Sequence, residues 1–192
     1  MQLYNHLKRK PYTINFEKWL FPFNDHSAFF DDWSQKLYIA YMSSINKPTE
    51  TDGCFQYPYI SNNELFYIHF NLGNILKKCD FGSDSVIDVS LQHFALPPNQ
   101  PDYIYYPKKF WCPKKHLRSQ FPILCCDVPN QYGGNCQAVI DGNHRVSAKK
   151  SRHIESIRVL HYKVTEPKDF SNYFEYVVYK FLLERNVQKT KS

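Results

Sequence analysis

The sequence predicts an α+β fold, because an amphipathic helical segment comes early in the chain, short apolar strands gather in its second half, and an aromatic helix closes it. Of the 192 residues, 43% are hydrophobic and 17% are aromatic. Such a chain can bury a core and differs from disordered chains, which are poor in aromatic groups. We expect one globule, with residues 1–100 as an aromatic-rich N-terminal elaboration and residues 101–192 as a small mixed sheet with helices.

The N-terminal part predicts one clear helix and some less certain strands. Residues 25–45 combine early acidic groups, which suit the positive end of a helix, with apolar groups at a period near 3.6 residues. Residues 65–70 form a short apolar run that fits either a strand or a buried helix. Residues 86–94 alternate loosely, and residues 103–106 predict a short edge strand in a proline-rich stretch.

The pattern becomes sharper after residue 121. Residues 122–128 and 138–140 are apolar strands joined by a glycine-containing turn, so we expect a hairpin. Residues 157–162 predict a third strand, and residues 167–185 a helix with one apolar face. We expect this face to pack in the core; its members are Phe170, Phe174, Val177, Val178, Phe181 and Leu182.

Charge, cysteine usage and hydropathy restrict the class of protein. The net charge of +6 is enough to attract phosphates but does not establish a nucleic-acid partner. No apolar run approaches the roughly 18 residues of a membrane span, and the N-terminus lacks the order of a signal peptide, so we expect a cytoplasmic protein. The six cysteines form no C-x-x-C pair and predict reduced, buried thiols. Cys125 and Cys126 should point to opposite faces of one strand.

The segment Asp141-Gly142-Asn143-His144-Arg145 lies between a buried strand and a short helix that ends near Ser151. Glycine at this place can adopt backbone angles that other residues avoid and allows a ligand to approach closely. Asn143 is a suitable N-cap for the helix. The N–H groups of a first helical turn have no partner within the helix, so this turn is a natural anion site.

Basic side chains strengthen this interpretation without settling it. Arg145, Lys149 and Arg152 are spaced i, i+4 and i+7, along one helix face. Cations near a helix N-terminus oppose the helix dipole, which is tolerable where an anion binds. The alternative is structural: Asp141 would then only fix the turn, and residues 149–152 would be a solvated face. The spacing alone leaves both interpretations open.

Residues 139–148 resemble the signature of the ParB/sulfiredoxin-like superfamily, an apolar strand followed by D-G-x-H-R and an Ala-containing helix. This superfamily includes ParB-type partition proteins, sulfiredoxins, free serine kinases and regulators of DNA phosphorothioation. With the preceding hairpin and the following strand, the resemblance extends over residues 122–162. The motif points to the fold more than to one reaction, because this fold has several functions.

The resemblance implies that Gly142, Asn143, His144 and Arg145 bind nucleotide phosphates. It also implies a catalytic pair, in which Asp141 binds a divalent metal or orients a hydroxyl group and His144 stabilises charge on the transferred phosphate. The expected cofactor is a nucleoside di- or triphosphate with Mg²⁺. Sulfiredoxins have their nucleophilic cysteine where this chain has Asn143, so sulfiredoxin activity is not expected. Structurally, Asp141 could simply fix the turn and His144 could be an ordinary hydrogen-bonded histidine.

Three functions remain open at this stage. The first is an NTPase or a phosphotransferase with a small hydroxyl substrate, which also needs a base; the acidic residues that could supply it are Glu50, Glu64, Asp84, Asp88 and Asp127. The second is a DNA-linked ParB-like nuclease or regulator, although the roughly thirty residues after Tyr162 leave no room for a helix-turn-helix reader. The third is a catalytically silent binding module with an aromatic partner surface.

The basic residues that would contact DNA phosphates in the second function occur as scattered pairs, which are also a common feature of soluble proteins. They are Lys77, Lys78, Lys108, Lys109, Lys114, Lys115 and Arg118. Contact with several phosphates would make binding fall steeply with salt, whereas binding of a small molecule would not.

Overall fold

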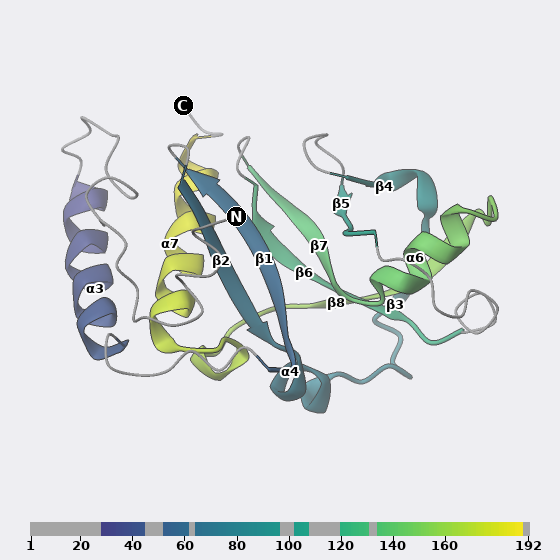
Figure 1. Ribbon diagram of the computed structural model, residues 1–192, viewed down its shortest axis with the longest axis horizontal. Helices are drawn as coiled ribbons and strands as arrows, with labels where there is room; N and C mark the ends of the chain where they lie inside the picture. Colours follow the sequence, from purple (N-terminus) through teal and green to yellow (C-terminus); the bar gives the residue numbers. More distant parts are fainter. Residues whose placement is uncertain are drawn as a thin grey trace. The chain divides into compact units, whose positions relative to one another are not determined.

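The computed structural model describes residues 28–44, 52–61, 64–96, 102–107, 120–130 and 134–189. In these residues the protein is a mixed α+β structure with one two-stranded sheet and one six-stranded sheet (Figure 1). The chain divides into two compact units. The split unit consists of residues 1–74 and 165–192, and the central unit of residues 75–164. The expected boundary near residue 100 therefore differs from this division, in which the C-terminal helix belongs with the N-terminal part.

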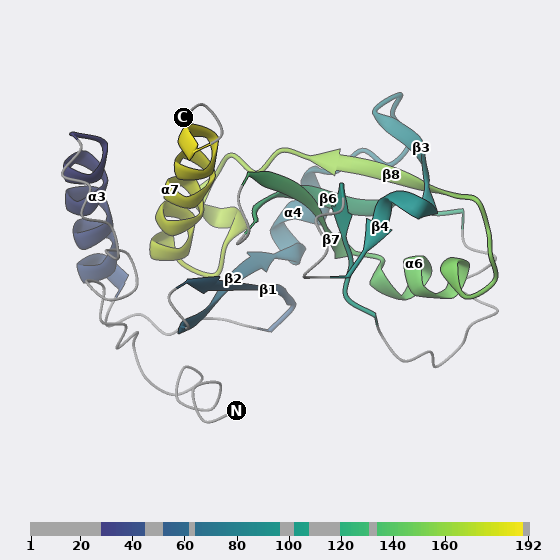
Figure 2. The same cartoon turned by 90° about the horizontal axis from the view of Figure 1, so that it is seen from above.

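The split unit contains helices and a β-hairpin. Helix α3 spans Ala28–Ser44, the strands are β1 (Cys54–Ser61) and β2 (Glu64–Asn71), and the chain ends with helix α7 (Tyr173–Lys189). The two strands are antiparallel, with Tyr57 opposite Ile68. Helix α7 lies between α3 and the hairpin (Figures 1 and 2). The short run at residues 65–70 is thus a strand, which the sequence pattern alone did not decide.

Aromatic rings fill the core of the split unit. Trp33 of α3 contacts Phe181 of α7 with ring centroids 5.7 Å apart, and Phe66 of β2 contacts Phe174 at 6.3 Å. The apolar face predicted for the terminal helix is buried, and Val178 and Phe174 have no exposed surface. This prediction is confirmed, and it explains much of the aromatic content as core packing.

The central unit is built on the six-stranded sheet, in the order β3-β8-β6-β7-β5-β4. Helix α4 (Leu72–Lys78) leads into this unit, which also contains the 3₁₀ helix η1 (Leu91–His93) and helix α6 (Asn143–Lys150). The other 3₁₀ helix, η2 (Pro167–Asp169), belongs to the split unit. The strands of the sheet are β3 (Val86–Ser90), β4 (Phe94–Ala95), β5 (Tyr103–Ile104), β6 (Ile123–Pro129), β7 (Asn135–Asp141) and β8 (Ser156–Tyr162).

The topology confirms the hairpin and corrects one strand position. Strands β6 and β7 are antiparallel, with Cys126 opposite Ala138, as the turn between them predicts. Strand β8 follows α6 and is parallel to β6. The prediction that residues 103–106 form an edge strand is wrong, because β5 lies between β4 and β7 and is parallel to both. Prolines around a strand limit its length, but they do not determine its neighbours.

Helix α6 covers one face of this sheet. Its Val146 joins a buried cluster with Ile123, Cys125 and Val139, and none of these four side chains has exposed surface. Cys125 and Cys126 are both fully buried and alternate along β6, as predicted. The cysteines that the structure describes carry free thiols, whereas Cys112 lies outside the described residues. None of the helices in the described ranges is long and apolar enough to cross a membrane.

Candidate functional site

Gly142 makes the turn from β7 into α6. It is the N-cap of the helix and has a φ of +100°, in the left-handed region that favours glycine. A Cβ atom at this position would lie 2.5 Å from Ile123 Cγ2 and 2.9 Å from Arg145 Nη2. The unusual backbone angle predicted for Gly142 is therefore confirmed, and the turn is packed against β6 as well.

Asn143 is the first residue of the helix, so its predicted role as N-cap is wrong. Its buried side-chain amide instead connects two other segments. Nδ2 donates to the carbonyl oxygen of Val139 at 2.8 Å, and Oδ1 accepts from the backbone N–H of Tyr106 at 2.7 Å. Because Gly142 has no side chain, no side-chain cap closes the start of α6. The helix N–H groups that a cap would satisfy are the ones the anion hypothesis needs.

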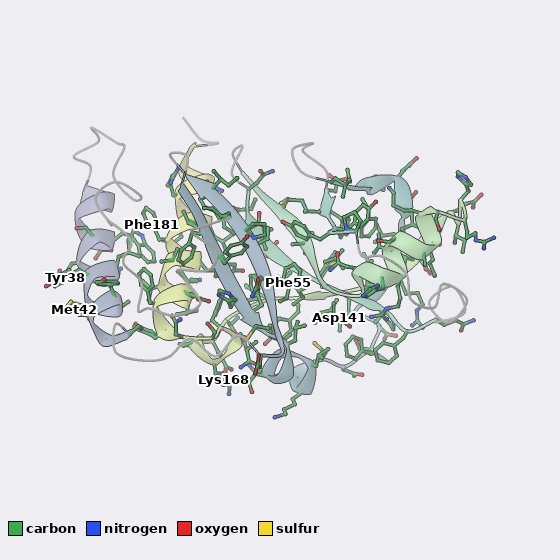
Figure 3. All side chains as sticks on the ribbon, viewed as in Figure 1. Tyr38, Met42, Phe55, Asp141, Lys168 and Phe181 are labelled. Carbon is green, nitrogen blue, oxygen red and sulfur yellow. The ribbon has the colours of Figure 1, made fainter. Side chains whose placement is uncertain are left out.

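Arg145 is buried and holds the turn together (Figure 3, where Asp141 is labelled at the end of β7). Nη1 donates to the carbonyl oxygens of Phe121 at 2.7 Å and Pro122 at 2.8 Å, and Nη2 donates to Asp141 Oδ2 at 2.9 Å. The guanidinium also lies 5.7 Å from the centroid of the Phe121 ring. Burial lowers the pKa of Arg145, while the adjacent Asp141 opposes this shift. The guanidinium thus links the segment before β6 to the turn after β7.

The predicted basic face of α6 consists of three different environments. Arg145 is buried, Lys149 is half-buried and Arg152 is exposed. Burial lowers the pKa of Lys149, and nearby Asp88 acts in the opposite direction. The neighbouring Lys150 donates to the carbonyl oxygens of Leu91 and Phe94, so it fastens η1 to α6. The spacing alone gave no indication of these backbone partners.

Asp141 and His144 are the more accessible members of the motif. The Asp141 side chain is 39% exposed although it is paired with Arg145, whose side chain is only 11% exposed. His144 is half-buried in the first turn of α6. A divalent cation bound to Asp141 would lie close to the guanidinium, which would weaken its attraction to this carboxylate. The geometry therefore favours anion binding at the turn over metal binding.

Within the central unit, Asp127 and Asp88 lie on other parts of the sheet than Asp141. Asp127 is opposite Gln137 in the β6–β7 ladder, whereas Asp141 is opposite Leu124, nearer the other end of the same hairpin. Asp88 lies in β3, at one edge of the sheet, and Asp84 precedes β3. Glu64 begins β2 in the split unit, and Glu50 lies outside the described residues.

The structure also bears on the predicted metal site and on the predicted basic pairs. Over the described ranges, no group of three His, Cys, Asp or Glu side chains is placed to hold a metal ion. Of the basic pairs, Lys77 and Lys78 occupy the last turn of α4. The remaining members, at positions 108, 109, 114, 115 and 118, are not among the described residues.

Comparisons of the chain with family models, with curated proteins and with solved structures found no match. The resemblance to the ParB/sulfiredoxin-like superfamily therefore remains a prediction from the motif and its strand–turn–helix setting.

Proposed function

We propose that this chain is a nucleotide-binding protein of the ParB/sulfiredoxin-like type, and that the β7–α6 turn holds the phosphates of a nucleoside di- or triphosphate. The observation that carries this proposal is the start of α6 on a left-handed glycine without a side-chain cap. Among the described residues, the first turn of α6 also contains no acidic side chain. Its N–H groups and its positive dipole end are therefore suited to an anion.

The arrangement of the sheet supports the proposal. The β6–β7 hairpin, the motif turn, α6 and the parallel strand β8 follow one another in the order that the resemblance implies. The sheet of the central unit is mixed, with parallel and antiparallel pairs, which supports the proposal. A likeness at this level supports a fold and a ligand class, while the reaction depends on the side chains of the site.

Each residue of the motif has a separate role in the proposed binding of the nucleotide. Backbone N–H groups at the start of α6 and the imidazole of His144 bind phosphate oxygens, and Gly142 supplies the left-handed turn that leads into the helix. Arg145 adds positive charge and keeps the turn rigid, because its hydrogen bonds to Phe121, Pro122 and Asp141 fix its position. Asp141 presents a half-exposed carboxylate that would orient a hydroxyl group or a Mg²⁺ ion carried by the nucleotide. The reaction would be NTP hydrolysis or phosphoryl transfer to a small hydroxyl substrate.

Calorimetric titration of the full chain with ATP, ADP, CTP and GTP, with and without Mg²⁺, tests binding. We expect saturable binding of at least one nucleotide, weakened about tenfold or more by His144→Ala, since hydrogen bonds to charged groups contribute about 1.5–3 kcal/mol. The matched control is His93→Ala, which removes an exposed histidine of the same unit. A folded protein that binds none of these nucleotides contradicts the proposal.

The catalytic part is tested separately with Asp141→Asn. The amide can still accept the hydrogen bond from Arg145, so we expect the fold and nucleotide binding to persist while Mg²⁺-dependent turnover is lost. Persistent turnover would make Asp141 a turn residue only. Titration with duplex DNA at several salt concentrations tests the alternative function, because contact with phosphates gives a log–log slope of about −0.9 per phosphate.

A further inference from the structure

A second group of polar side chains lies on the α6-covered face of the sheet, away from the motif turn. Along β6 this face has Ile123 and Cys125, both fully buried, followed by the exposed Asp127. Along β8 the buried Val159 is followed in the same way by the exposed His161. We call the group the sheet cluster; its members are Tyr103 of β5, Gln137 of β7, Asp127 of β6 and His161 of β8.

The strand registers bring these residues together. Tyr103 is opposite Gln137, Gln137 is opposite Asp127, and His161 is opposite Cys125, whose side chain lies on the same face as that of Asp127. Four neighbouring strands of one sheet each contribute one member. Polar groups that converge from separate rigid strands beside an apolar core are typical of a ligand site.

An aromatic column forms one side of the sheet cluster. The Tyr103 ring stacks between Phe94, at 4.6 Å between centroids, and His161, at 5.6 Å. Tyr103 Oη and His161 Nε2 are hydrogen-bonded at 2.8 Å, across the two strands that separate β5 from β8. Burial lowers the pKa of His161, and the nearby Asp127 opposes this shift. The hydrogen bond and the stacking fix the orientation of this ring.

The other side of the sheet cluster has an oxygen atom that lacks a donor. Gln137 Nε2 donates a short hydrogen bond to Asp127 Oδ1, which fixes the amide orientation and leaves Gln137 Oε1 pointing elsewhere. Oε1 is buried and has no hydrogen-bond partner among the residues that the structure describes. A buried acceptor without a donor is destabilising, and native proteins rarely keep one. A ligand that donates a hydrogen bond would remove this cost.

We propose that the sheet cluster binds a small organic cation with N–H donors, of the guanidinium or primary-ammonium class. The donor atoms of such a cation match the acceptors present, the Asp127 carboxylate and Gln137 Oε1. The carboxylate of Asp127 favours a cation over an anion. This inference does not depend on nucleotide binding, since the sheet cluster shares no residue with the motif turn.

The probe is methylguanidinium, titrated into ¹⁵N-labelled full-length protein at constant ionic strength, with methylammonium as the second arm. We expect saturable changes in the side-chain amide signals of Gln137 and the ring signals of His161. Tetramethylammonium, which has the same charge but no N–H group, should give no saturable change. This comparison on the unmodified protein needs no variant to fold.

Two variants sharpen the test. Asp127→Asn should weaken methylguanidinium binding about tenfold or more, because the cation then donates to a neutral amide instead of a carboxylate. Asp88→Asn makes the same change in charge on an exposed residue of the edge strand β3 and should leave the affinity unchanged. The proposal is overturned if methylguanidinium causes no saturable change, if tetramethylammonium acts equally well, or if both variants weaken binding alike.

Discussion

Among the described residues, each unit contains a pair of acidic and basic side chains of unequal burial, and the two pairs differ in which member is buried more deeply. In the central unit, Arg145 is buried and its partner Asp141 is 39% exposed. In the split unit, the carboxylate of Glu175 has no exposed surface and its partner His69 is 11% exposed. The Arg145–Asp141 pair therefore buries its basic member more deeply, and the His69–Glu175 pair its acidic member.

The hydrogen bonds of Glu175 explain why its carboxylate can be buried. Its oxygens accept from the backbone N–H of His69 at 2.7 Å and lie 2.9 Å from His69 Nδ1. Asn172 contributes a further side-chain contact to Oε1 at 3.4 Å, and its own Oδ1 accepts from the backbone N–H of Glu175 at 2.9 Å. Glu175 thus fastens strand β2 to the start of α7.

The difference in burial between the two acids suggests different roles: the His69–Glu175 pair is structural, whereas the Arg145–Asp141 pair leaves an acid accessible to a ligand. The carboxylate of Glu175 is buried and hydrogen-bonded inside the protein, so it stabilises the fold and is not accessible to a ligand. Arg145 likewise donates to backbone carbonyls, but its partner Asp141 keeps a carboxylate that is 39% exposed. A buried cation that positions a half-exposed acid and an uncapped helix end is an arrangement that a ligand can use.

The largest effect on the free energy of unfolding is expected for the buried carboxylate of Glu175. Glu175→Ala leaves the His69 groups without their acceptor and should lower the free energy of unfolding by about 3–5 kcal/mol in chemical denaturation. Glu184→Ala, at an exposed position of the same helix, should change it by about 0.5 kcal/mol or less. Similar values for the two variants would remove the contrast between the pairs.

The next effect concerns the turn that Arg145 holds. Gly142→Ala combines backbone strain of about 1–2 kcal/mol with a clash against Ile123 of about 1–3 kcal/mol, so urea denaturation should show a loss of about 2–5 kcal/mol. Gly134→Ala is the matched control, because Gly134 also has a positive φ, of +67°, but nothing within 4 Å of an added Cβ. It should lose about 1–2 kcal/mol. An equal loss in both variants would mean that the turn is not tightly packed.

Arg145→Ala distinguishes a positioning residue from a phosphate ligand. The carbonyls of Phe121 and Pro122 would lose their donor, and we expect the free energy of unfolding to fall by about 2–4 kcal/mol in the absence of nucleotide. Nucleotide affinity should fall as well, by about 1.5–3 kcal/mol, because the turn is no longer held and its charge is lost. Arg158→Ala, on the exposed side of β8, should alter neither quantity. Unchanged stability with weakened affinity would make Arg145 a direct ligand.

The smallest effect on stability concerns a buried group that stays uncharged, the thiol of Cys136. Burial raises the pKa of Cys136 from 9.0 to about 12, so its thiol stays protonated in the folded protein while the unfolded chain ionises. The resulting stability is fully present below pH 9 and is lost as the pH rises towards 12. Between pH 8 and 10 the wild type should therefore lose about 1 kcal/mol more than Cys136→Ala in urea denaturation. Parallel pH profiles of the two proteins would contradict this.

Local patterns in the sequence predicted much of the fold but little of the pairing. The β6–β7 hairpin, strand β8, the buried face of α7 and the left-handed Gly142 follow from apolar periodicity and glycine placement. Strand β1 was not predicted, because Pro58 and the polar residues of Cys54–Ser61 obscure its alternation. The position of β5 depends on parallel partners far away in the chain, which periodicity does not encode.

The same limit applies to the candidate site. The residues of the motif were identifiable from their types and spacing, but the partners of Arg145 were not. Two of its acceptors are backbone carbonyls, at Phe121 and Pro122, and every residue carries such a group, so no residue type marks them. The sheet cluster was missed for a related reason. Its members come from four strands, and only the strand order brings His161 and Tyr103 together.

The order of the strands also governs how the chain can be synthesised and folded. Strand β3 is an edge strand whose only neighbour in the described sheet is β8, and β8 comes later in the chain than every other strand of that sheet. A nascent chain therefore carries β3 with an unpaired edge until residues 156–162 have left the ribosome. Any product that stops before Ser156 leaves β3 without its neighbour in the described sheet and β6 unpaired on one side, so both strands become targets for chaperones and proteases.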